Sequence, residues 1–326
     1  MRALVTGAGG FVGQWLCRDL LRRGWVVTGA TLDGAPDAAR SILSAEERGA
    51  VRWTTADVSR AEGVRAALDS ADRPDAVFHL AGVSFVPGAG SDPGLTCETN
   101  VVAAARLLGE VRVRRRAGAL DPVVLVVGSA EQYGRHDAAE LPLGETAEQR
   151  PLTVYAASKA AQEVFAMEAF RSEGVRVVAT RSFNHSGAGQ APHFLMPALV
   201  RRALALRAAA ARGDAGGLLI GNRDTVRDFL HVRDVVRAYI LLVERGLPGE
   251  AYNVSSGVGH RVDALAAQAL AALGVSAELT TDPALARPVE VPALVGDSTK
   301  LRRATGWAPA FDTSEIIHDL IHAATQ

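Results

Sequence analysis

The chain has little cysteine and almost no net charge. Its 326 residues include two cysteines, Cys17 and Cys97, which lie in different segments. Two cysteines make neither a disulfide framework nor a set of metal ligands, so we expect no metal site and two small, buried apolar side chains. The formal net charge of -1 gives no global field that would attract nucleic acid.

The chain also lacks a long hydrophobic run. No apolar stretch is long enough to span a bilayer. The first residues, "MRALVTG", already read as a strand and show no charged leader with a cleavage site. We therefore predict a cytoplasmic protein with no membrane or nucleic-acid partner. The one basic cluster, "RVRRR" at 112–116, is interpreted as a solvated helix end, where cations complement the helix dipole.

Apolar strand-like runs alternate with helical patterns through the first half of the chain. The expected strands cover 2–7, 25–31, 76–82, 122–130 and 175–183. The expected helices cover 11–24, 95–115 and 155–174. Continuous apolar strands separated by helices are typical of a parallel sheet that is covered on both faces. The sequence therefore predicts an α/β fold with a Rossmann-like, doubly wound parallel sheet.

The regular alternation of strand-like and helical patterns ends at about residue 184. Helical patterns follow at 194–213, 261–274 and 313–324, with one more strand-like run at 251–257. We predict a dinucleotide-binding domain and a smaller C-terminal substrate-binding lobe. The first is expected to cover 1–183, with 222–256 returning to it, and the second to cover 184–221 and 257–326.

The segment "TGAGGFVG" (6–13) carries three glycines, Gly7, Gly10 and Gly13, between a strand and a helix. The first glycine allows a tight turn, the second lets the backbone approach a pyrophosphate, and the third permits close packing of helix and strand. The helix N-terminus offers N–H groups to the anion. This context favours a dinucleotide site over the alternative, a tight turn without a ligand.

The segment "YAASK" (155–159) places Tyr155 and Lys159 four residues apart on an expected helix, and so on one face. A phenol has an ordinary pKa near 10, which makes it a poor base at neutral pH. A nearby ammonium favours the phenolate. Tyr155 is therefore a candidate acid and base for a hydride-transfer reaction, with Lys159 beside it. The alternative is an exposed Tyr and Lys on a solvated helix.

The segment "GSAEQYG" (128–134) follows an apolar strand. Ser129 is a candidate for hydrogen-bonding the reacting oxygen and positioning it against Tyr155. Glu131 is a candidate catalytic base. Tyr133 is expected to be a packing residue.

These motifs resemble the extended short-chain dehydrogenase/reductase family, which includes NAD-dependent epimerases and dehydratases. The resemblance implies a bound NAD or NADP. It also implies that Lys159 holds the nicotinamide ribose. The residues that it assigns to the cofactor are Gly7, Gly10, Phe11, Val12, Gly13, Thr31, Asp57, Val58, Leu80, Ala81, Gly82, Asn100, Tyr155, Lys159 and His185.

The choice between NAD and NADP stays open at this point. An acidic residue at the end of the second strand would accept from the ribose hydroxyls of NAD. Thr31 stands near that place and favours NADP, whereas Asp33, two residues later, favours NAD.

Three later segments are similar to enzymes of the GDP-mannose pathway, especially 4-keto-6-deoxy-mannose reductases and 4,6-dehydratases. They are "RSFNHSGAGQ", "GNRDTVRDFLHVRDVVRAY" and "RPVEVPALVGDSTKLRRATGW". The resemblance implies a nucleotide-diphospho-sugar substrate, with GDP favoured. Arginine suits the two phosphates because its forked guanidinium pairs with phosphate oxygens. The implied substrate contacts are Ser84, Asn184, Arg227, Arg287 and Glu290.

The residues after Ser129 bear on the reaction. A 4,6-dehydratase needs a base at C5 and an acid at O6. Glu131 could serve as the base, but Ala130 cannot donate a proton. The leading hypothesis is therefore reduction of a GDP-linked 4-keto-6-deoxy-hexose with NADH or NADPH. The first alternative is 4-epimerisation of a nucleotide-linked hexose or heptose through a transient ketone. Two less favoured alternatives are a 4,6-dehydratase and a non-catalytic dinucleotide-binding protein.

Two residues depart from the reductase pattern. His231 stands where the reductases carry Asp, and Ala188 replaces the proline of their "GPGQ" segment. The segment around His231 is more similar to epimerases and dehydratases, and both departures weigh against a strict reductase assignment. The family resemblance also implies a homodimer built from the helices at 95–115 and 155–174.

Overall fold

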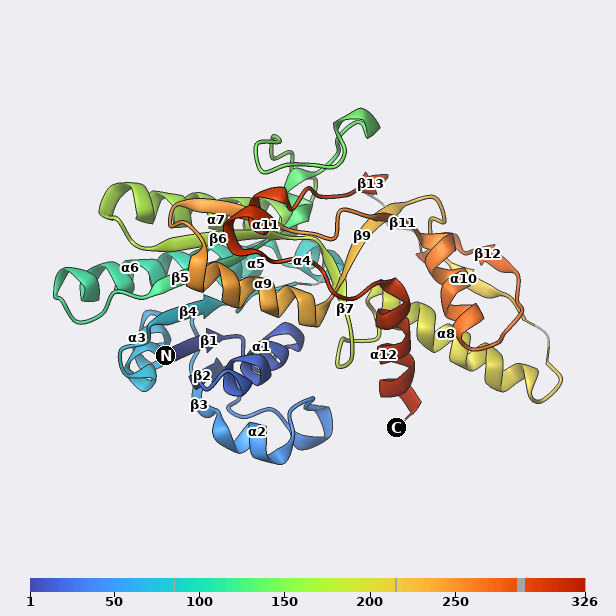
Figure 1. The fold of residues 1–326 in the computed structure, drawn as a ribbon, viewed down its shortest axis with the longest axis horizontal. Coiled ribbons are helices and arrows are strands. Elements are labelled where there is room, and N and C mark those ends of the chain that lie inside the picture. Colours follow the sequence, from blue (N-terminus) through green and yellow to red (C-terminus); the bar gives the residue numbers. More distant parts are fainter. Residues whose placement is uncertain (85, 215, 286–290, 326) are drawn as a thin grey trace.

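The computed structural model describes residues 1–84, 86–214, 216–285 and 291–325 (Figure 1). Its largest element is a sheet of seven strands in the order β10-β6-β5-β4-β1-β2-β3, and every neighbouring pair is parallel. The strands are β1 (Arg2–Thr6), β2 (Val26–Thr31), β3 (Arg52–Thr55), β4 (Ala76–His79), β5 (Val123–Ser129), β6 (Val177–Ser182) and β10 (Glu250–Val254). The predicted Rossmann-like fold is confirmed.

Helices cover both faces of this sheet. One face carries α1 (Phe11–Arg22), α9 (Val232–Arg245) and α11 (Thr299–Thr305), and the other carries α3 (Ala61–Ala71), α6 (Ala103–Arg116) and α7 (Val154–Glu173). Successive strand residues enter different cores: Ala3 and Val5 pack with α1, and Leu4 packs with α3. This two-sided burial explains why the strands read as continuous apolar runs.

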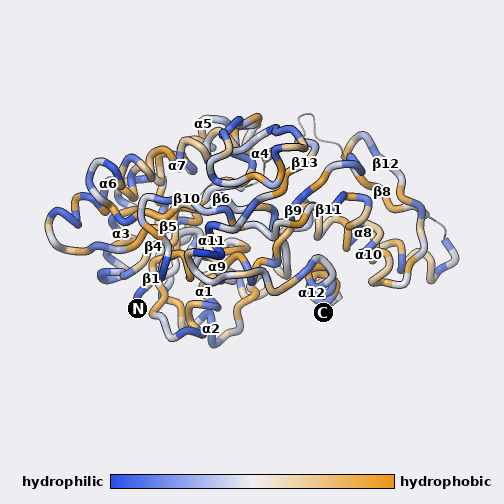
Figure 2. Tube along the Cα trace, turned by 45° about the horizontal axis from the view of Figure 1, so that its top comes forward, coloured by the Kyte–Doolittle hydropathy of each residue, from blue (hydrophilic) through white to orange (hydrophobic). Residues whose placement is uncertain are grey.

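A second, smaller part lies beyond the carboxyl ends of the strands (Figure 1). Its sheet joins β7 (Asn184–Ser186), β9 (Val226–His231), β11 (Gly259–Arg261) and β13 (Ala293–Leu294), and a strand pair joins β8 (Leu218–Ile220) to β12 (Leu279–Thr281). Three helices, α8 (Leu195–Ala210), α10 (Val262–Ala272) and α12 (Thr313–Thr325), share one apolar core. Within 222–256, β10 is an edge strand of the main sheet and α9 packs against that sheet, whereas β9 belongs to the smaller sheet. Figure 2 shows the alternation of polar and apolar residues along the chain.

The expected helix at 95–115 is three pieces. A short α5 (Pro93–Cys97) leads through a π-helical turn at Glu98–Val102 into α6. Two further short helices, α2 (Ala45–Ala50) and α4 (Val86–Ser91), lie in connections.

Cys97 at the end of α5 is exposed, so the prediction that both cysteines are buried is wrong for this residue. Cys17 in α1 is buried. Short 3₁₀ turns cover Ala38–Arg40, Ala130–Tyr133, Ala138–Glu140 and Pro283–Leu285.

The basic cluster at the end of α6 is paired with acidic side chains. Arg112 contacts Glu168, Arg114 contacts Glu110, and Arg116 contacts Glu173; Arg115 pairs with Asp121. This supports the interpretation as an ordinary helix end. Within the described ranges, the helices are too short or too polar to cross a membrane. The cytoplasmic location stays a prediction.

Candidate active site

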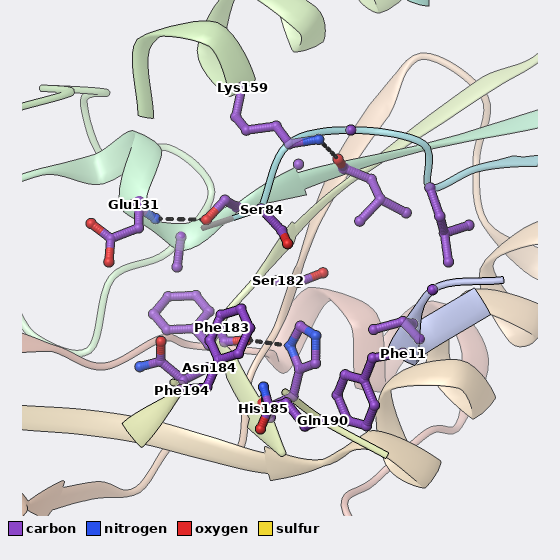
Figure 3. Close-up of a pocket in the computed structure, with 18 of the residues that line it drawn as sticks. Phe11, Ser84, Glu131, Lys159, Ser182, Phe183, Asn184, His185, Gln190 and Phe194 are labelled. Atoms are coloured by element: carbon purple, nitrogen blue, oxygen red, sulfur yellow. Dashed lines mark hydrogen bonds between the residues drawn. The ribbon is translucent and has the colours of Figure 1, made fainter. Parts of the chain in front are cut away.

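A cavity of about 390 Å³ opens at the carboxyl ends of β1, β4 and β5 (Figure 3). It is bounded on its other side by β7, β9 and the start of α8. Parallel α/β sheets bind their ligands at the carboxyl ends of the strands. The cavity therefore lies where the fold favours a ligand.

The glycine loop forms one wall of this cavity. Gly7 has φ +70°, and a Cβ there would lie 2.8 Å from the backbone nitrogen of Ala81. A Cβ on Gly13 would lie 2.3 Å from the carbonyl oxygen of Gly7. Helix α1 starts at Phe11 without a side-chain cap. Its first N–H groups are therefore available to an anion such as a pyrophosphate.

The segment after β4 forms the floor of the cavity. Leu80, Ala81 and Gly82 line it, and the N–H of Ala81 donates to Thr6 Oγ1 at 3.2 Å. Asn100, in the π-helical turn, is fully buried behind this floor. Its Oδ1 accepts from the N–H of Val83 at 2.8 Å. Asn100 therefore fixes the floor instead of lining the cavity.

Ser129, Tyr155 and Lys159 meet at the inner end of the cavity. Ser129 ends β5, and the other two lie one turn apart on α7; all three are buried and line the cavity. The Ser129 hydroxyl accepts from the N–H of Glu131 at 3.2 Å and lies close enough to the Tyr155 hydroxyl to influence its pKa. Lys159 Nζ donates to the carbonyl oxygen of Val127 at 2.9 Å (Figure 3) and to Gln162 Oε1 at 2.9 Å. These three predicted catalytic groups thus share one site with the fourth, Glu131, which also lines the cavity.

The surroundings set the protonation of these groups. Burial raises the pKa of Tyr155 to about 12; the Ser129 hydroxyl opposes this shift, and the nearby Glu131 carboxylate adds to it. Burial lowers the pKa of Lys159 to about 8. At neutral pH Tyr155 therefore holds its proton while most of Lys159 stays charged. This is the state from which a phenol donates a proton to a ketone oxygen as it is reduced.

On the opposite wall of the cavity, the His185 ring lies over the Phe11 ring (Figure 3). The two rings are stacked, with centroids 6.3 Å apart and planes at 11°. His185 Nδ1 lies 2.9 Å from the carbonyl oxygen of Phe183. A carbonyl only accepts, so Nδ1 carries the proton. Burial lowers the pKa of His185, which keeps the ring neutral. His185 lies next to the glycine loop, as a cofactor contact requires.

The site thus combines a glycine loop with a Ser–Tyr–Lys set in one cavity. The family model of GDP-mannose 4,6 dehydratase matches residues 4–320. The chain belongs to the GDP-mannose 4,6 dehydratase family.

Relatives within and around this family catalyse several reactions. A GDP-6-deoxy-D-mannose reductase from Pseudomonas aeruginosa is 33% identical over 248 residues, which cover 76% of this chain and 79% of the relative. The structure of RMD from Pseudomonas aeruginosa complexed with NADPH has a TM-score of 0.82 at 28% identity and covers 100% of both chains. The UDP-glucose 4-epimerase of Thermus thermophilus in complex with NAD has a TM-score of 0.83 at 28% identity, covering 99% of this chain and 98% of that one. The resemblance to nucleotide-sugar enzymes of the extended short-chain dehydrogenase type is confirmed.

Within this family site, three implied substrate contacts fall in the described part of the chain and line the cavity: Ser84, Asn184 and Arg227. Asn184 Nδ2 is buried and has no hydrogen-bond partner among the described residues, so it suits a substrate oxygen. Arg227 is buried and also donates to the carbonyl oxygen of Val226 at 3.0 Å. The other two implied contacts, Arg287 and Glu290, lie outside the described residues.

Besides Asn100, three implied cofactor contacts lie outside the cavity lining. Thr31 ends β2 beside the glycine loop, where its Cγ2 is 3.3 Å from the position of a Cβ on Gly9. Asp57 accepts from Ser59 Oγ at 2.6 Å, and Val58 is buried in the apolar core. Their contact with the adenosine end of the cofactor stays a prediction.

Several lining residues have no signal in the sequence. Ser182 and Tyr239 both line the cavity and bond to each other at 2.7 Å. They come from β6 and α9, two segments far apart in the chain. The other lining residues that the sequence did not indicate are Val83, Val127, Phe183, Gln190, Phe194, Leu195, Met196, Phe229 and Leu294.

The two departures from the reductase pattern meet at one carboxylate. Asp319 Oδ2 accepts from the N–H of Ala188 at 2.7 Å and lies 3.4 Å from His231 Nε2. A proline at 188 would lack that N–H. His231 Nδ1 also accepts from the N–H of Arg233 at 3.1 Å, which caps α9. Neither departure lines the cavity, so both concern the packing of α12 and not the reacting groups.

Proposed function

We propose that this protein reduces the C4 ketone of a GDP-linked 4-keto-6-deoxy-hexose. The observation that carries this proposal is the Ser129–Tyr155–Lys159 set beside Ala130. That set suffices for ketone reduction, and Ala130 offers no proton where dehydration needs an acid. Bound NADPH or NADH would supply the hydride to C4. The similarity to the Pseudomonas aeruginosa reductase supports the same reaction.

Each group of the set would have one task. Ser129 would donate to the ketone oxygen and hold it near Tyr155. Tyr155, which keeps its proton because burial raises its pKa, would give that proton to O4 as the C4 alcohol forms. The Lys159 ammonium would stabilise the resulting phenolate. Arg227 would pair with the diphosphate.

The apolar wall of the cavity fits a sugar without a hydroxyl at C6. Ala130, Phe183, Phe194 and Leu294 line the cavity, and Ala130, Phe183 and Leu294 belong to one apolar cluster. A methyl group would bury apolar area there, whereas a hydroxyl would lose hydrogen bonds to water. This supports a 6-deoxy sugar as the substrate.

The cofactor and the domain division extend the proposal. Thr31 puts an uncharged side chain at the end of β2, which a 2′-phosphate tolerates better than a carboxylate; we therefore propose NADPH over NADH. We assign 1–183 with α9 and β10 to the dinucleotide-binding domain. We assign 184–221 and 257–326, with β9 but without α11, which packs on the main sheet, to the nucleotide-sugar lobe.

A direct assay tests this function. Purified protein is mixed with NADPH and GDP-4-keto-6-deoxy-mannose, and the loss of NADPH and the product sugar are followed together. We expect one NADPH oxidised for each 6-deoxy-hexose formed, and slower turnover with NADH. If the ketone is consumed without loss of either reduced cofactor, the reductase proposal fails.

The second candidate is C4 epimerisation. It is favoured by the similarity to the Thermus thermophilus UDP-glucose 4-epimerase in complex with NAD. An epimerase would retain NAD through purification and would interconvert two nucleotide sugars with no added cofactor. Dehydration would instead place solvent deuterium at C5. The cofactor that co-purifies and the deuterium position separate these reactions.

We propose that the protein forms a homodimer through α6 and α7. The outer surface of α7 exposes two neighbouring large apolar side chains, Val164 at 66% and Phe165 at 45% exposure. Exposed apolar patches often mark protein interfaces. We expect the Phe165→Glu variant to run as a monomer of 34.2 kDa in light scattering, while the wild type has twice that mass. Leu219→Glu is the matched control, because Leu219 is equally exposed at 46% but lies on β8. A wild-type monomer would refute the proposal.

A further inference from the structure

Gln132 links the catalytic turn to the catalytic helix. It is fully buried, and its Oε1 accepts from the backbone N–H of Ser129 at 2.7 Å. Its Nε2 donates to Glu163 Oε2 at 2.9 Å and lies 3.3 Å from Gln149 Oε1. One side-chain amide thus bridges the end of β5 and a carboxylate on α7.

Glu163 is held in a fixed orientation. Its two oxygens receive a fork from Arg181, with Nε–Oε2 at 3.0 Å and Nη2–Oε1 at 2.6 Å. Gln149 Nε2 donates to Oε1 at 3.0 Å. With Gln132, four donors serve the carboxylate, which is about its full capacity. A buried charge that is paired and hydrogen-bonded in this way stays in place.

The spacing on α7 connects this carboxylate to the reaction. Tyr155, Lys159 and Glu163 follow one another at intervals of four residues and are all buried, so they form one row on the helix. The first two face the cavity directly. The third reaches Ser129 through Gln132.

We propose that Gln132 is a positioning residue that fixes the Ser129 hydroxyl relative to Tyr155. This inference rests on the proposed function. Only one orientation of the amide satisfies both partners, because Ser129 presents a donor and Glu163 presents an acceptor. Helix α7 thereby positions all three catalytic groups, two through its own side chains and Ser129 through the amide.

The backbone beside the amide fits this role. A Cβ on Gly128 would lie 2.5 Å from Gln132 Oε1 and 2.4 Å from the carbonyl oxygen of Thr180. The amide therefore fills the space that a side chain at 128 would need. Without it, the Ser129 N–H would be buried without an acceptor and the turn would shift. A displacement of about 1 Å in a reacting group costs on the order of 100-fold in rate.

A double-mutant cycle tests the inference. We expect Gln132→Met to lower kcat about tenfold and Ser129→Ala to lower it about 100-fold, with KM for the sugar and the Kd of NADPH little changed. The double variant should match Ser129→Ala alone, because Gln132 acts through Ser129. An additive loss of about 1,000-fold would show independent roles and overturn the inference. If Ser129→Ala leaves kcat unchanged, the proposed function fails instead.

Two further variants guard against a purely structural effect. Gln149→Met removes a neighbour of Glu163 but leaves the bond between Gln132 and Ser129, so we expect lower thermal stability and an unchanged kcat. Gln132→Glu retains an acceptor for Ser129 but sets a second carboxylate against Glu163. The pair must share a proton, so kcat should fall relative to the wild type as pH rises and the proton leaves. Loss of kcat in Gln149→Met, or a pH-independent ratio for Gln132→Glu, would contradict the role.

Discussion

The Tyr155→Phe variant is expected to lose about 10²- to 10⁴-fold in kcat for ketone reduction, the range that general acid catalysis contributes. The phenol is the group that burial keeps protonated in the cavity, and phenylalanine has the same ring without the proton. Binding should survive, because the glycine loop and Lys159 are untouched. Single-turnover kinetics with NADPH and the 4-keto sugar would measure the loss in the chemical step.

Tyr133→Phe is the matched control for this loss. Tyr133 is also fully buried, but its hydroxyl donates to Asn253 Oδ1 at 2.7 Å and accepts from Arg181 at 3.0 Å, away from the cavity lining. We expect a loss of about 1–3 kcal/mol in the free energy of unfolding, because a buried partner is left unsatisfied, with kcat nearly unchanged. Unchanged turnover in Tyr155→Phe would mean that the catalytic assignment is wrong.

The sequence indicated the parts of the molecule that depend on short-range patterns. The strands β1, β4 and β5 are buried on both faces, so each reads as a mainly apolar run. The glycine loop and the Tyr155–Lys159 pair each lie within a few residues, so their geometry follows from one turn or one helix. The packing role of Tyr133 was also indicated.

Elements that mix polar and apolar residues were harder to predict from the sequence. The edge strand β3 is only four residues long and none of them is buried. In β9, by contrast, Arg227, Asp228 and His231 are buried. The Asp228 carboxylate accepts hydrogen bonds from the backbone N–H groups of Ser256, Gly257 and Gly296. Tertiary hydrogen bonds satisfy these side chains, and a hydropathy pattern does not show such partners.

The π-helical turn has a similar cause. A run of helix-forming residues at 95–115 predicts one helix, but Asn100 must reach the backbone of Val83 and the hydroxyl of Ser158. The extra residue of a π turn directs it there. The Gln132–Glu163 link was missed for the same reason, since 31 residues separate its partners.

The Gly13→Ala variant is expected to lose cofactor binding, with the Kd of NADPH rising on the order of 100-fold or more, because the first turn of α1 must move from its site. The added Cβ would lie 2.3 Å from the Gly7 carbonyl oxygen and 2.8 Å from Ala8 Cα, and both are backbone atoms that cannot rotate away. Fluorescence titration with NADPH would give the Kd. Thermal denaturation should show a loss of about 1–3 kcal/mol from overpacking.

Gly49→Ala supplies the control, because it makes the same chemical change in a helix where a Cβ would meet nothing within 4 Å. Alanine favours a helix over glycine by about 1 kcal/mol, so this variant should be as stable as the wild type or slightly more so, with an unchanged Kd. The two variants thus separate contact at the loop from backbone preference. If Gly13→Ala binds NADPH as tightly as Gly49→Ala does, the close approach of α1 to β1 is not what holds the pyrophosphate.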